Sequence, residues 1–124
     1  MGSKVWATAA WAPHEPSRII DPGEFADVGY QVSRSAGLEL LNRPKSEHHR
    51  YRAATAYALA AFEEVLKFVP PGQDAIPADA FTSEAGRARY RKGPGKFRRN
   101  FIQMTIDSTR RVLANIDKSI PPSD

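Results

Sequence analysis

Two stretches of the sequence repeat apolar residues at alternating steps of four and three, and they constrain the fold more than any other feature. The first stretch contains Tyr51, Thr55, Ala58, Phe62, Val65 and Val69, and the second contains Ile102, Ile106, Thr109, Leu113, Ile116 and Ile120. This spacing places all members of a stretch on one face of an α-helix, as in helices that pack along their length against another helix. The two matched faces therefore predict an all-α protein.

Capping and breaking signals divide the chain into further helices. Asp21 is an acidic cap followed by proline and then by Glu24, a combination typical of a helix start, and we expect a helix over residues 22–41. Its apolar face is expected to comprise Phe25, Val28, Val32, Leu38 and Leu41. A second helix is predicted from Ser46 to Val69, a short one after the cap Thr82, and a last one from about Lys96 to Ser119.

These elements predict a single domain over residues 21–120, a small bundle of three long helices and one short helix. Three of the ten prolines lie within residues 13–22, so residues 1–20 are expected to form an extended N-terminal arm, and residues 121–124 a frayed tail. Alternatively, two chains complete one bundle as a homodimer, because the two apolar faces would serve that arrangement equally well.

Composition excludes several classes of protein. The 124 residues include no cysteine, so a disulfide framework, a thiolate zinc site and a cysteine nucleophile are all excluded. The longest nearly apolar run, Ala53 to Phe62, is about half of the roughly 20 residues that span a bilayer, so no membrane helix is predicted. No phosphate-loop or dinucleotide-binding glycine pattern occurs. We therefore expect a cytoplasmic protein that needs no cofactor.

A metal site is not expected either. His48 and His49 are neighbours on a predicted helix, so their rings point about 100° apart and do not converge on one ion. We expect both histidines to be exposed side chains in the first turn of that helix.

One short segment holds most of the positive charge. The net charge is +4, but residues 87–99 contain seven basic and no acidic side chains. These are Arg87, Arg89, Arg91, Lys92, Lys96, Arg98 and Arg99, with the aromatic residues Tyr90 and Phe97 between them. Arginine predominates, which favours forked contacts to phosphate or carboxylate groups. The segment therefore predicts a basic corner that binds nucleic-acid backbone, with the two aromatic rings stacking on bases.

Two other uses of this segment remain open. Its side chains could pair within the chain with Glu63, Glu64, Asp79 and Glu84, or they could dock on an acidic protein surface. Binding of DNA or RNA becomes the more favoured interpretation if a second basic group lies on the same side of the molecule. That group consists of Arg43, Lys45, Arg50 and Arg52.

A final alternative is catalytic. Arg43 is followed, after four intervening residues, by His48, and this spacing resembles that of helical ribonucleases of the HEPN class. In that family the histidine aids attack of the ribose 2′-hydroxyl and the arginine steadies the phosphate. The resemblance implies a metal-independent ribonuclease centred on Arg43 and His48, although Pro44 directly after the arginine departs from the family's pattern. A non-catalytic binding protein is our principal expectation.

Overall fold

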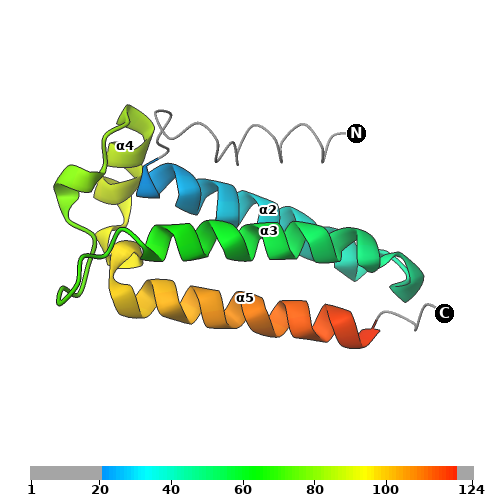
Figure 1. Cartoon of the computed structure of the whole chain (residues 1–124). Helices are drawn as coiled ribbons and strands as arrows, with labels where there is room; N and C mark the ends of the chain where they lie inside the picture. Colours follow the sequence, from blue (N-terminus) through cyan, green and yellow to red (C-terminus); the bar gives the residue numbers. More distant parts are fainter. Residues whose placement is uncertain (1–20, 120–124) are drawn as a thin grey trace, which may run out of the picture.

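The computed structural model describes residues 21–119, and all the regular structure in this part of the chain is helical (Figure 1). The elements in chain order are α2 (Pro22–Asn42), η1 (Lys45–Glu47), α3 (His49–Leu66), η2 (Ala78–Ala80), α4 (Glu84–Lys92), η3 (Pro94–Phe97) and α5 (Arg99–Ser119), where η marks a 3₁₀ turn. Within the described range the only sheet-like pairing is an isolated bridge between Ala75 and Arg98. The predicted arm over residues 1–20 and tail over 121–124 lie outside the described residues.

The three long helices run side by side, with α3 as the shared partner. Both α2 and α5 pack along α3, and the short helix α4 lies at the end of the bundle where α2 begins (Figure 1). In contrast, α2 and α5 do not pack along each other. The predicted all-α architecture of three long helices and one short helix is confirmed, and within residues 21–119 no element covers the side of the bundle between α2 and α5.

The core is built from the two apolar faces that the sequence indicates. Five members of the first stretch are buried, namely Thr55, Ala58, Phe62, Val65 and Val69. Ile102, Ile106, Thr109 and Ile116 of the second stretch are buried as well. These residues meet within one chain, so both faces are already used when the domain is a monomer.

The predicted face of α2 is only partly right: Phe25 and Val32 pack against the core, but its second half does not follow the prediction. Leu38 and Leu41 are 57% and 83% exposed, whereas Ala26, Gly29 and Ala36 are buried. The reason is the close approach of α2 to α3, because a Cβ atom on Gly29 would lie only 2.6 Å from the ring of Phe62. Large side chains on this face would hold the two helices apart, so the face consists of small residues instead.

Helix boundaries also differ from those expected at four places. A separate 3₁₀ turn, η1, precedes α3, and α3 ends at Leu66, earlier than Val69. The cap of α4 is Ser83 rather than Thr82, because its side chain accepts a hydrogen bond from the amide of Gly86. The 3₁₀ turn η3 separates α4 from α5 and starts at Pro94, so α5 begins at Arg99.

One buried carboxylate joins the starts of α2 and α4. Asp21 is 1% exposed, and its Oδ1 accepts from the amide of Glu24, as the capping signal predicts. Its Oδ2 accepts from both the amide and the hydroxyl of Ser83, at 2.8 and 2.9 Å. The same hydroxyl accepts from the amide of Gly86, at 2.8 Å. Asp21 thus caps α2 directly and α4 through Ser83, where the positive ends of both helix dipoles stabilise its charge.

The two helix starts touch at glycine. A Cβ atom on Gly23 would lie 2.6 Å from Cα of Gly86, and one on Gly86 would lie 2.2 Å from Oδ2 of Asp21. Neither space admits a methyl group, because one neighbour is backbone and the other is a carboxylate fixed by its hydrogen bonds. This contact sets the position of α4 on α2.

We predict opposite effects for two glycine substitutions. Gly86→Ala should lower the free energy of unfolding by about 2–3 kcal/mol, because overpacking against Asp21 outweighs the gain in helix propensity. Gly37→Ala, where nothing lies within 4 Å of the new Cβ, should raise it by about 0.5–1 kcal/mol. Urea denaturation of both variants measures the difference, and a shift of the same sign in both would contradict this account of the helix contact.

Candidate anion-binding groove

A groove between α2 and the short helix α4 brings together several cations that have no carboxylate partner in residues 21–119. Its volume is about 1160 Å³, and it is open to solvent. The charged side chains that line it are Glu24, Asp27, Arg34, Arg89, Arg91, Lys92 and Lys96. Five basic groups therefore face two carboxylates. We call this surface the basic groove.

One ion pair crosses the basic groove and holds its walls together. A guanidinium nitrogen of Arg89 on α4 donates to a carboxylate oxygen of Asp27 on α2. Both side chains are partly shielded from solvent, with exposed fractions of 32% and 39%. Within residues 21–119, Arg34, Arg91, Lys92 and Lys96 have no carboxylate partner. Four unneutralised cations thus line the groove, with Glu24 as the only other carboxylate among its lining residues.

The predicted internal pairing of the basic segment is not what the structure shows. Glu63 pairs with Arg110 at 3.0 Å, and Glu64 pairs with Lys67 at 2.8 Å. The hydrogen bond from Lys67 raises the pKa of its own ammonium group. In the described part of the chain, Asp27 is the single carboxylate that pairs with a residue of 87–99. The density of positive charge in this segment therefore remains largely uncompensated.

Arg87 and Arg99 bind backbone carbonyl groups rather than carboxylates. Arg87 donates to the carbonyl of Thr82 at 2.7 Å. Arg99 donates twice to the carbonyl of Gln73, at 2.9 and 3.2 Å, and once to that of Pro70, at 3.3 Å. Arg99 therefore ties the loop after α3 to the start of α5, and its role is structural. Arg98 beside it is exposed.

The two predicted stacking residues lie inside an aromatic cluster. Phe97 is 1% exposed, and its ring meets that of Phe81 edge-on with centroids 4.8 Å apart. The ring of Tyr90 lies 4.6 Å from Phe81 and is half-buried. Phe97 therefore belongs to the core and offers no face to a base. The ring of Tyr30 reaches the basic groove, because Nζ of Lys96 lies over it, 5.6 Å from the ring centroid.

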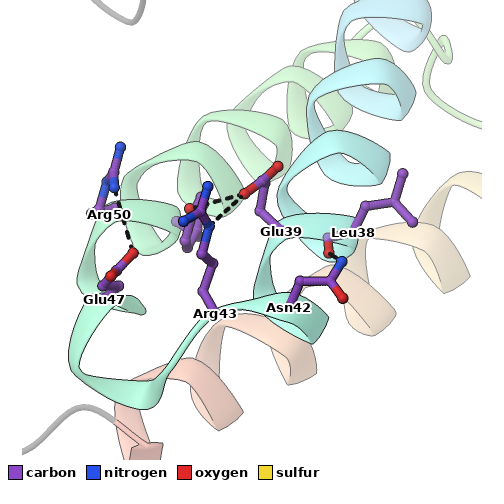
Figure 2. A network of polar contacts seen from close by, with 7 residues as sticks. Leu38, Glu39, Asn42, Arg43, Glu47 and Arg50 are labelled. Carbon is purple, nitrogen blue, oxygen red and sulfur yellow. Dashed lines mark hydrogen bonds and ion pairs between the residues drawn. The ribbon is translucent and has the colours of Figure 1, made fainter.

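The second basic group lies at the opposite end of the bundle and does not extend the basic groove. Arg43 donates to Glu39 at 3.0 Å, and Arg50 lies 3.6 Å from Glu47 (Figure 2). The hydrogen bond from Arg43 holds the pKa of the Glu39 carboxyl below its usual range. Arg52 pairs with Asp117 on α5, and Lys45 is exposed in η1. Three of the four cations therefore have acidic partners.

The arginine and histidine of the ribonuclease-like spacing are engaged in local contacts. Nδ1 of His48 lies 2.9 Å from the hydroxyl of Ser119, and Nε2 is buried without a hydrogen-bond partner. Because the Ser119 hydroxyl donates to the carbonyl of Ile116, Nδ1 must carry the proton of a neutral ring. A histidine that takes a proton from a ribose hydroxyl must present a free ring nitrogen to its substrate. The free nitrogen of His48 is Nε2, and it is buried, so it does not face a substrate at the surface.

Sequence reasoning missed Arg34, Asp27 and Glu24 as members of the groove. Each stands alone in the sequence among uncharged neighbours or residues of opposite sign, so no local pattern marks it. They reach the basic segment only through the contact of α2 with α4. Within residues 21–119 no group of three metal-ligating side chains comes together, and no helix there is long and apolar enough to cross a membrane.

We predict that two neighbouring arginines differ in their contribution to stability. Arg99→Ala should lower the free energy of unfolding by about 1–2 kcal/mol, because it leaves the carbonyls of the loop without their donor. Arg98→Ala should change it by less than about 0.5 kcal/mol, as is usual for an exposed side chain. Thermal and urea unfolding measure both values. Equal losses in the two variants would show that the contacts of Arg99 are not a structural tie.

Comparisons of the chain with protein-family models, with curated protein sequences and with solved structures found no match. Any functional conclusion therefore has to come from the chemistry of the surfaces described above.

Proposed function

We propose that this protein is a non-catalytic binding protein whose basic groove takes the phosphate backbone of a nucleic acid. The observation that supports the proposal is the convergence of Arg34, Arg91, Lys92 and Lys96 on one groove without carboxylate partners in residues 21–119. Cations held close together repel one another, so a polyanion that enters the groove relieves this repulsion. Bound DNA or RNA would release its condensed counterions, which makes binding favourable and dependent on salt.

Individual side chains have distinct roles in this proposal. Arg91 and Lys92 lie in the last turn of α4, are exposed, and are the primary phosphate ligands. Arg34 contributes a third contact from α2, on the opposite wall of the groove. Arg89 positions α4 through Asp27, and its charge is already neutralised. Because nothing in the groove is arranged to read base edges, we expect little sequence preference.

The proposal places the protein in the cytoplasm. A chain without cysteine has no disulfide bond that this reducing compartment would break. An acidic protein surface is the competing ligand for the same cations. Its carboxylates would satisfy the arginine forks in the same way as phosphates. The experiment below includes a carboxylate polymer so that the two ligands can be distinguished.

The test is a charge reversal that spares the structural arginines. Arg91→Glu with Lys92→Glu should weaken binding of short labelled single-stranded and duplex DNA and RNA by about tenfold or more, and it should lower the slope of log K against log salt by about 2. Fluorescence anisotropy across a salt series measures both quantities. Circular dichroism and urea denaturation verify that the variant is folded.

The matched control reverses the same number of charges elsewhere. Arg111→Glu with Lys118→Glu alters two exposed cations on α5, and it should leave affinity within about twofold at physiological salt, where screening limits distant charges. Equal losses in the two double variants would show that net charge, and not the groove, drives binding. Binding of polyglutamate without binding of nucleic acid would replace the proposal with an acidic protein partner.

A further inference from the structure

The open side of the bundle between α2 and α5 forms a second groove, separate in chemistry from the first. Its volume is about 450 Å³. Its floor is Phe62 of α3, and its walls are Tyr30 and Ser33 of α2 and Met104, Thr105, Ser108, Thr109 and Arg111 of α5. None of these lining residues is acidic. We call this surface the apolar groove.

Two hydroxyls in the walls of the apolar groove are already satisfied within the chain. The hydroxyl of Thr105 donates to the carbonyl of Phe101 at 3.0 Å, and that of Thr109 donates to the carbonyl of Thr105 at 2.8 Å. Both hydroxyls are therefore satisfied within α5. Met104 on the same wall is 55% exposed. The other polar side chains of the lining belong to Tyr30, Ser33, Ser108 and Arg111. An occupant therefore needs polar as well as apolar groups on the buried side.

The apolar character continues along both helices beyond the groove itself. Val112 lies four residues after Ser108, so it extends the same strip of α5, and it is 43% exposed. Leu41 lies eight residues after Ser33 on α2 and is 83% exposed. Val112 and Leu41 thus extend the exposed apolar surface along α5 and α2. Among residues 21–119, no helix covers this side of α2 and α5, where a four-helix bundle would place its fourth helix.

Charge specifies the kind of helix that fits. Met104, Arg111 and Lys118 recur at seven-residue intervals and form one strip along α5 beside the apolar groove. Arg111 and Lys118 are exposed and have no carboxylate partner in residues 21–119. A helix that lies in the groove therefore meets cations along its flank. A second copy of this chain would bring a strip of the same sign.

We propose that the apolar groove binds an amphipathic helix of a partner protein, with apolar residues on one face and acidic residues along its flanks. Burial of Met104, Val112 and Leu41 against the apolar face supplies affinity, and Arg111 and Lys118 select the sign of the flanking charge. This mode is helix-in-groove recognition, in which anchors follow helical spacing. The proposal does not rest on phosphate binding in the basic groove, and the two surfaces meet where Nζ of Lys96 lies over the ring of Tyr30.

The experiment uses two designed peptides of the length of α5 and the full chain. Both peptides carry leucines at alternating steps of four and three; one has glutamates on the flanks and the other has lysines. We expect the glutamate peptide to bind, and the lysine peptide to bind at least about tenfold more weakly. Arg111→Glu should reduce this preference or reverse it. Isothermal titration calorimetry at low and physiological salt measures the affinities.

Two exposed positions on α5 give a matched pair of variants. Val112→Asp introduces a charge beside the groove and should weaken the glutamate peptide by about tenfold or more. Ala114→Asp introduces the same charge about 160° around the helix, and it should leave the affinity within about twofold. Both positions are exposed, so both variants should fold.

Several outcomes would overturn the proposal. Equal affinity for the two peptides, or equal loss in Val112→Asp and Ala114→Asp, would remove the role of the groove. Loss of peptide binding in the Arg91→Glu, Lys92→Glu variant would place the peptide in the basic groove instead. Sedimentation equilibrium that shows a dimer of the 13.7 kDa chain, dissociated by Val112→Asp, would identify a second copy as the occupant.

Discussion

A single buried carboxylate organises the end of this bundle where the basic groove lies. Asp21 accepts hydrogen bonds at the start of α2 and, through Ser83, at the start of α4, so two helix N-termini meet at one charge. Burial of a carboxylate is costly unless donors surround it, and the donors here come from segments that are remote in sequence. The contact of Gly23 with Gly86 follows from this arrangement, and with it the position of every cation on α4.

The distribution of ion pairs divides the molecule into two electrically different ends. At the end formed by η1 and the start of α3, Arg43, Arg50 and Arg52 have acidic partners. At the α4 end, one ion pair joins the walls of the basic groove and four cations remain. Exposed ion pairs contribute little to stability, so this asymmetry matters for the choice of ligand more than for the fold. The proposed anion site and the proposed helix site then use different properties of the same open bundle.

The fold was predictable from local signals because each depends on residues close together in the chain. The spacing of Phe62 and Val65, the cap at Asp21 and the break at Pro70 act within one or two helical turns, and the corresponding elements are confirmed. The face of α2 was only partly predictable in this way, because Phe25 and Val32 pack against the core as expected but Leu38 and Leu41 do not. Hydrophobicity alone favours Leu38 and Leu41 as buried residues. The short distance between α2 and α3 instead requires small residues at the contact, as at Gly29 against Phe62. That distance is set only when the two helices pack.

The sequence by itself determined the helices, the core faces of α3 and α5 and the concentration of positive charge in residues 87–99, since periodicity, capping and charge density are properties of neighbouring residues. Tertiary structure alone decided which of those charges are free. In the folded chain Glu63 pairs with Arg110 and Asp27 pairs with Arg89. The same packing places Arg34 in the basic groove. The physical reason is that an ion pair or a groove depends on distances between side chains remote in sequence, and only the packing of the helices sets those distances.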